Sequence, residues 1–134
     1  MDYIDKQIIA LLKKNSRLTN KEIGEKIHLT GQAVGNRVNK LIEHEIIKSF
    51  TIDVRYENTQ YIRLFMNSTA FSTIERVVNN FEEIETFDKV SGQACYAIVT
   101  HFSQDRLNEF IEKISKWARY SVETVVTNKL RNES

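Results

Sequence analysis

Hydrophobic side chains near the start of the chain recur at helical spacing. Ile4, Ile8 and Leu11 are separated by four and three residues, so they share one face of a helix. Asp2 just before them is a residue type that caps a helix start. The pattern predicts a first helix that ends before a polar break at residues 15–17.

Two further helices are predicted after this break. Thr19 and Glu22 have the spacing of a capping box, in which each residue bonds the backbone of the other. A turn at 28–29 separates this short helix from a longer one, which Thr30 caps and which runs to about His44. A short helix, a brief turn and a longer helix form a helix-turn-helix, the unit that places its second helix in the DNA major groove.

The pattern changes after the third helix. Partial alternation over residues 46–54 predicts a connecting strand. The remainder reads as strand, helix, strand, strand, helix, strand, which is typical of a ferredoxin-like sheet with two helices on one face. The strands are expected at 61–69, 84–90, 94–100 and 122–130, and the helical apolar positions run from Ile74 to Phe81 and from Leu107 to Ala118.

The predicted fold class is therefore α+β, with two domains. An N-terminal winged-type helix-turn-helix with its connecting strand covers residues 1–55, and a βαββαβ ferredoxin-like domain covers residues 56–134. Valine, phenylalanine and tyrosine on the predicted strands make the second sheet face too apolar for bare exposure to water. A second copy of the chain is the simplest cover, so we expect a dimer.

Charge and cysteine content narrow the class of protein. Residues 1–55 carry ten Lys/Arg against seven Asp/Glu, and residues 56–134 carry nine against eleven, so a mildly basic head joins a mildly acidic body. Cys95 is the single cysteine, which excludes an intrachain disulfide and agrees with a reducing compartment. The start lacks a signal-peptide pattern, and no apolar run approaches the ~20 residues of a membrane span. We expect a cytoplasmic protein without membrane contact.

The third predicted helix carries polar residues on the side that its apolar stripe leaves free. The amides of Gln32 and Asn36 suit adenine edges, and Lys40 can reach guanine or a phosphate. The predicted DNA-binding residues are Thr30, Gln32, Asn36, Arg37, Asn39 and Lys40.

Other residues around this helix have supporting roles in the prediction. Gly31 and Gly35 would let the helix lie close to DNA, and Gly24 would let the two helices cross closely. Arg37 borders the apolar stripe, where it can contact a phosphate or brace the fold. Phosphate contacts that position the protein are expected from Arg17, Thr19, Lys21 and Lys48.

No set of residues supports catalysis, a cofactor or a metal site. The three histidines and Cys95 are scattered and lack metal-ligand spacing. Cys95 lies in an apolar strand, where a cysteine more often packs than reacts. A small ferredoxin-like enzyme or metal carrier would have only Cys95 in its favour, so we expect a protein that is not an enzyme.

Several segments together resemble the Lrp/AsnC family, the leucine-responsive or feast/famine regulators. They are Asp2-x-x-Asp5-x-x-Ile8-x-x-Leu11, Asn15-Ser16-Arg17, Lys21-Glu22-Ile23-Gly24, Leu29-Thr30, Val34, Arg37-Val38, Leu41-Ile42-Glu43 and Ile46-Ile47. Val90-Ser91-Gly92 and Val122–Thr127 resemble the family's C-terminal (RAM-type) effector and assembly domain. The resemblance covers nearly the whole chain. It implies a sequence-specific DNA-binding transcription regulator that forms dimers or octamers and responds to an amino acid or related molecule.

The resemblance also implies where an effector binds. That place is the turn between the second and third strands of the C-terminal domain, which here offers Ser91, Gly92, Gln93 and Cys95. Three positions depart from the family pattern. His28 and Glu45 stand where the family has glycine, and Cys95 stands where it commonly has an acidic residue that holds the effector's amino group. A small-molecule sensing or assembly module with a non-functional DNA-binding head is the alternative function.

Overall fold

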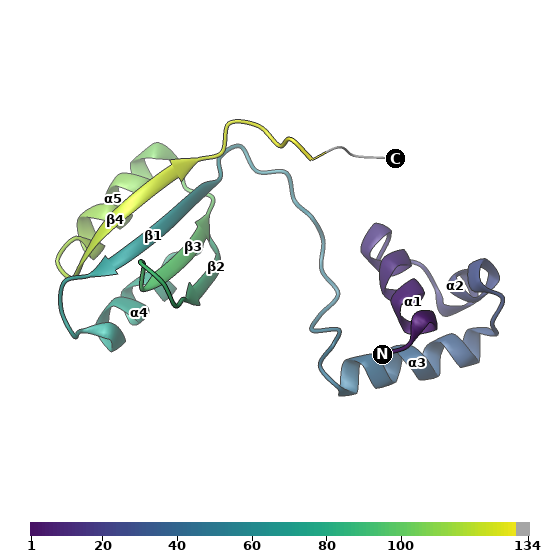
Figure 1. The fold of residues 1–134 in the computed structure, drawn as a ribbon. Coiled ribbons are helices and arrows are strands. Elements are labelled where there is room, and N and C mark those ends of the chain that lie inside the picture. Colours follow the sequence, from purple (N-terminus) through teal and green to yellow (C-terminus); the bar gives the residue numbers. More distant parts are fainter. Residues whose placement is uncertain (131–134) are drawn as a thin grey trace. The chain divides into compact units, whose positions relative to one another are not determined.

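Three helices make up the first of two units in the computed structural model, which describes residues 1–130 (Figure 1). This unit spans Met1–Val54, and the second unit begins at Arg55. Its helices are α1 (Tyr3–Lys14), α2 (Asn20–Ile27) and α3 (Gly31–Glu43). The predicted caps are present. Asp2 accepts a hydrogen bond from the Asp5 amide, Thr19 and Glu22 form the capping box, and Thr30 accepts from the Ala33 amide.

Apolar faces of the three helices meet in one small core. Its buried members are Ile8, Ile23, Val34 and Val38, with Ile4, Leu11, Leu12, Leu18, Ile27 and Leu29 packed around them. Each helix contributes at the spacing of three or four residues on which the prediction rested. This core uses one side of α3 and leaves the other side free.

The turn between α2 and α3 depends on two unusual backbone positions. His28 adopts the left-handed conformation, with φ 61° and ψ 43°, and its amide bonds the carbonyl of Gly24. A Cβ added to Gly24 would lie 2.2 Å from the carbonyl oxygen of Leu29, so the predicted close approach at this glycine is made by the turn itself. Glu45 after α3 also has positive φ, at 58°. Both non-glycine residues therefore occupy conformations that glycine adopts at lower cost.

The connecting strand predicted over residues 46–54 does not form within the chain. The amides of Ile46 and Ile47 bond the Leu41 carbonyl, and the following residues are not assigned to a strand. A strand needs a neighbour to pair its backbone groups, and the single chain supplies none in this stretch. The segment nevertheless exposes apolar side chains, with Phe50 at 52% and Ile52 at 77% exposure.

The second unit is a four-stranded antiparallel sheet with two helices. Its elements are β1 (Gln60–Met66), α4 (Phe71–Asn79), β2 (Ile84–Lys89), β3 (Tyr96–Thr100), α5 (Gln104–Ile114) and β4 (Ala118–Thr124). The strand order is β2-β3-β1-β4, with β1 central between β3 and β4. This is the expected βαββαβ topology, and Figure 1 shows α4 and α5 on the same face of the sheet.

The last helix and strand lie earlier in the sequence than predicted. The amide of Trp117 bonds the carbonyl of Ile114 and ends α5, while the carbonyl of Trp117 accepts from the Asn67 amide. Ala118 therefore begins β4 opposite Met66, although its apolar spacing resembles a further helical turn. The predicted strand at 122–130 was wrong in its boundaries because β4 ends at Thr124.

The core of the second unit fills the space between the sheet and its two helices. Its buried members include Ile62, Leu64, Ile74, Val78, Phe81, Tyr96, Ile98, Phe102, Phe110 and Ile114. The side chain of Gln60 places one buried amide in this unit. Gln60 Oε1 accepts from the Thr100 hydroxyl and the Phe102 amide, and its Nε2 donates to the Phe102 carbonyl. These bonds join the start of β1 to the end of β3 without leaving a polar group unpaired.

Among residues 55–130, no helix covers the other face of the sheet. Along β1, Tyr61 and Arg63 are exposed while Ile62 and Leu64 are buried. Phe65 lies on the same side of β1 as Tyr61, and the guanidinium of Arg119 on the neighbouring β4 lies over its ring. The uncovered face therefore carries aromatic side chains of the central strand β1.

Candidate DNA interface

The free side of α3 presents a row of polar side chains. Gln32, Asn36, Asn39 and Lys40 are all exposed, whereas the positions that face the core, such as Val34, are buried. Amides and an ammonium group at the spacing of one helical face match the edges of base pairs and the phosphates beside them. Four of the six residues predicted to bind DNA are thus brought together on one accessible surface.

The N-terminal ends of α2 and α3 add backbone and hydroxyl donors beside this row. The Thr30 side chain accepts from the Ala33 amide 3.1 Å away and caps α3. Thr19 and Lys21 are exposed at the start of α2. The hydrogen bond from the Thr19 amide lowers the pKa of the Glu22 carboxyl, which keeps the capping box charged and intact. Helix N-termini carry partial positive charge and suit phosphate oxygens.

Arg37, which was predicted to bind DNA or to brace the fold, forms ion pairs within the chain. Its Nη1 lies 2.7 Å from Asp2 Oδ2 and 3.2 Å from Asp5 Oδ1. The guanidinium bond lowers the pKa of the Asp2 carboxyl, with the Asp5 amide as the second cause. Of the two roles considered for Arg37, the contacts within the chain are those of a brace between α1 and α3.

Gly31 and Gly35 lie at the contact between α2 and α3. A Cβ on Gly31 would be 3.3 Å from the Lys21 backbone nitrogen, and one on Gly35 would be 3.0 Å from Asn20 Nδ2. Both glycines therefore leave room for α2, and their role in letting α3 lie close to DNA stays a prediction. The sequence analysis missed Asn20, an exposed amide held over α3. Two glycines four residues apart in α3 are the signal that some neighbour approaches this side.

The turn after β2 holds the residues predicted to bind an effector. Ser91, Gly92 and Gln93 are exposed, and Gly92 has φ 145°. Cys95 is partly buried against the core, and its amide bonds the Leu64 carbonyl. The turn thus offers hydroxyl and amide groups from three residues, while Cys95 faces partly inward as a packing residue.

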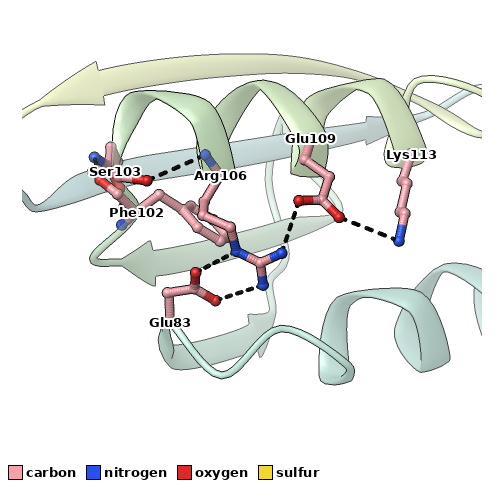
Figure 2. A network of polar contacts seen from close by, with 7 residues as sticks. Glu83, Phe102, Ser103, Arg106, Glu109 and Lys113 are labelled. Carbon is pink, nitrogen blue, oxygen red and sulfur yellow. Dashed lines mark hydrogen bonds and ion pairs between the residues drawn. The ribbon is translucent and has the colours of Figure 1, made fainter.

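Four charged side chains on α5 and just before β2 form a network in the second unit (Figure 2). Arg106 donates to both oxygens of Glu83 at 2.6 and 3.0 Å and to Glu109 at 2.8 Å, and Lys113 lies beyond Glu109. The Arg106 bond lowers the pKa of the Glu83 carboxyl. Each carboxylate in Figure 2 faces a cation, so the network fastens α5 to the segment before β2 and leaves no base for catalysis.

Among residues 1–130, no group of three or more His, Cys, Asp and Glu side chains gathers in the manner of metal ligands. Within the same residues no helix combines the length and apolarity required to cross a bilayer.

Residues 1–48 match the family described as winged helix-turn-helix DNA-binding. The chain is 41% identical over 128 residues to the HTH-type transcriptional regulator LrpB of Bacillus subtilis, covering 91% of this chain and 86% of that protein. Its structure is similar to that of B. subtilis LrpC, with a TM-score of 0.89 and 27% identity over 98% of this chain and 99% of that one.

A transcriptional regulator from Neisseria meningitidis, solved in complex with L-Met, shares the fold. Its TM-score is 0.84 at 17% identity, and the match covers 98% of this chain and 93% of that chain.

The helix-turn-helix with its exposed polar face and the βαββαβ unit define a DNA-binding transcription regulator. The chain belongs to the Lrp family of HTH-type transcriptional regulators, as the resemblance to Lrp/AsnC proteins predicted. This family is not enzymatic, in agreement with the expectation from the sequence. None of these findings favours a module that lacks DNA binding.

Proposed function

We propose that α3 reads DNA sequence through Gln32 and Asn36, with Asn39 and Lys40 extending the contact along the groove. The exposure of these side chains on one face of a capped helix supports the proposal. Thr30 contributes a phosphate contact at the helix start. Arg37 holds α3 in place through Asp2 and Asp5 and is not assigned to DNA.

The DNA-binding unit acts in pairs. The aromatic residues Tyr61 and Phe65 on the open sheet face, and the apolar segment 46–54 that forms no strand within residues 1–130, support a dimer in which a second copy covers both. Two copies of α3 would then read half-sites about one helical turn apart, roughly 34 Å. Further assembly into octamers is the extension that family resemblance suggests, and we place the protein in the cytoplasm.

An amino acid or related molecule modulates the regulator at the turn formed by Ser91, Gly92 and Gln93. The exposed turn and the fold shared with a protein solved with L-Met support this part of the proposal. Cys95 packs against the core, so the hydroxyl and amides of the turn would supply the polar contacts. Native mass spectrometry with a pool of amino acids tests assembly and ligand mass together.

Selection of binding sites from random duplexes tests the DNA-reading part. Gln32→Ala and Asn36→Ala are expected to weaken discrimination at individual base pairs by about 1–3 kcal/mol, because each loses an amide that pairs with a base edge. Lys40→Ala is expected to weaken all sites alike and to reduce the salt dependence by about one phosphate. Gln104→Ala and Lys116→Ala, exposed in the second unit, are the matched controls. Unchanged selectivity in both amide variants would overturn the assignment of α3.

A further inference from the structure

The side chain of Asn20, the first residue of α2, lies over Gly35 in the middle of α3. A Cβ added to Gly35 would be 3.0 Å from Asn20 Nδ2 and 3.8 Å from Asn20 Cγ. Apart from the α3 backbone and the two chain neighbours of Gly35, nothing else among residues 1–130 would meet that Cβ within 4 Å. The missing side chain at Gly35 therefore leaves room for one carboxamide.

The fold itself does not require glycine at position 35. Gly35 lies within the regular turns of α3, whereas the glycine with positive φ among residues 1–130 is Gly92. A Cβ on Gly24 would lie 2.2 Å from a backbone oxygen, but a Cβ on Gly35 would meet only the far end of a flexible side chain. Because glycine inside a helix is less favourable than alanine, the room at Gly35 matters for the position of the Asn20 carboxamide and not for backbone packing.

Gly35 lies on the flank of α3, between the buried side of the helix and its exposed polar row. Successive residues of a helix are rotated by about 100°, so Gly35 is about 100° from the buried Val34 and about 60° from the exposed Gln32. Asn20 is itself exposed. Its carboxamide accordingly lies beside the row that includes Gln32 and Asn36, and it remains accessible from outside the protein.

A helix that lies in the major groove brings its flanks to the phosphates. An α-helix with its side chains is about 10–12 Å across, and the groove is about 12 Å wide, so α3 would fill the groove from wall to wall. The exposed row would then face the base edges, and the flank at Gly35 would face one sugar–phosphate wall. The Asn20 carboxamide supplies N–H donors at that wall, and phosphate oxygens accept them.

We infer that Asn20 donates a hydrogen bond from Nδ2 to a DNA phosphate at the edge of the groove, and that Gly35 is the seat that keeps this carboxamide within reach. The inference rests on the proposed function, since it takes α3 as the helix that enters DNA. A carboxamide is neutral, so this contact positions the protein without reading the sequence and without releasing a counterion. In this respect Asn20 differs from Lys40.

Replacement of single phosphates tests the contact. Each phosphate of a selected site is replaced in turn by a methylphosphonate, which removes one acceptor oxygen and the charge. In the unmodified protein one position in each half-site should weaken binding at least about tenfold, because hydrogen bonds to charged groups are strong. That loss should shrink to the level of neighbouring positions in Asn20→Ala and stay complete in Gln32→Ala and in Asn108→Ala, an exposed control on α5. Equal profiles for Asn20→Ala and the unmodified protein would overturn the contact.

A double-mutant cycle tests the seat. Gly35→Ala should raise the urea midpoint of unfolding, because alanine favours the helix. It should nevertheless weaken DNA binding at least about threefold, because the added Cβ displaces the carboxamide by a few tenths of an ångström and a hydrogen bond depends on distance and angle. In the Asn20→Ala background, where no carboxamide can be displaced, Gly35→Ala should have little further effect on affinity.

Two results of this cycle would overturn the seat. Equal losses of affinity in both backgrounds would show that the methyl group of Gly35→Ala meets DNA directly. A lower urea midpoint for Gly35→Ala would show that the fold requires the glycine.

The same variants separate this inference from the proposed function. If Gln32→Ala and Asn36→Ala relax base discrimination while Asn20→Ala binds like the unmodified protein, the contact at Asn20 is refuted and α3 remains the reading helix. If all three variants bind like the unmodified protein, the proposed function is refuted together with the inference.

Discussion

Arg37 in the middle of α3 donates from Nη1 to the carboxylate of Asp2, the residue that also caps α1. The same guanidinium nitrogen reaches Asp5 one turn later. A single side chain thus fixes the start of one helix against the helix proposed to enter DNA. Asp2 is consequently both a local cap and a long-range anchor, and the orientation of α3 depends on the first residues of the chain.

Replacement of Arg37 by methionine separates bracing from phosphate contact. Because the brace acts equally on every DNA sequence, Arg37→Met should weaken binding to all sites by a similar factor and lower the urea midpoint of unfolding. The slope of log affinity against log salt should not change, since no phosphate contact is lost. Lys40→Ala, measured beside it, should reduce that slope by about one. A reduced slope for Arg37→Met would assign Arg37 to DNA.

The left-handed conformation of His28 predicts a stabilising substitution. The left-handed conformation destabilises the folded state by about 1–2 kcal/mol for a non-glycine residue. Glycine removes this cost, but its greater conformational entropy in the unfolded chain lowers the stability by about 0.4–1 kcal/mol. His28→Gly should therefore raise the free energy of unfolding by roughly 0.5–1 kcal/mol in urea titrations. Lys26→Gly, two residues earlier and inside α2, should lower it by about 1 kcal/mol. If both variants shift in the same direction, the turn geometry is not the cause.

Substitution of Gln60 should destabilise the fold far more than substitution of a polar residue usually does. Gln60→Leu leaves the Thr100 hydroxyl and the Phe102 amide and carbonyl buried without partners, each at a cost of about 1–3 kcal/mol. We expect a loss of at least about 3 kcal/mol in the stability of the second unit, measured by denaturant unfolding. Gln93→Leu, at an exposed turn, is the control and should change stability by less than about 0.5 kcal/mol. A loss of that small size for Gln60→Leu would contradict the buried network.

Acid should weaken the second unit through Glu83. Arg106 holds the pKa of Glu83 below its ordinary value of 4.5, so the carboxylate contributes stability above that pH and loses it as pH falls through the folded value. Urea midpoints from about pH 6 to about pH 3 should drop more steeply for the unmodified protein than for Arg106→Met. Parallel curves for the two proteins would show that the pair does not contribute.

Much of the fold could be predicted from local chemistry. The three N-terminal caps, the turn at residues 28–29 and the buried stripe of α3 all follow from residue types and their spacing. The end of α5 could not be predicted in this way, because Trp117 and Ala118 continue the apolar period of the helix. Pairing of Ala118 with Met66 on β1 decides their conformation, and that contact is distant in sequence.

In the candidate DNA interface, too, some residues could be predicted from local spacing, whereas others depend on contacts distant in sequence. Exposure of Gln32, Asn36 and Lys40 follows from the helical period alone. The role of Arg37 depends on Asp2, which lies 35 residues away in the sequence, and the role of Gly35 depends on Asn20. The spacing of apolar residues within one helix does not show which residues of another helix it contacts, so the roles of Arg37 and Gly35 could be assigned only from the structure.

The central claim is that an amide on α3 touches a base edge. It is tested most directly by a double-mutant cycle between Gln32→Ala and 7-deazaadenine placed at each adenine of a selected site, which removes only the N7 acceptor. We predict that one such position weakens binding of the unmodified protein by about 1–3 kcal/mol but has little effect on Gln32→Ala, since both changes remove the same contact. Additive losses at every adenine, for Gln32 and equally for Asn36, would contradict the account.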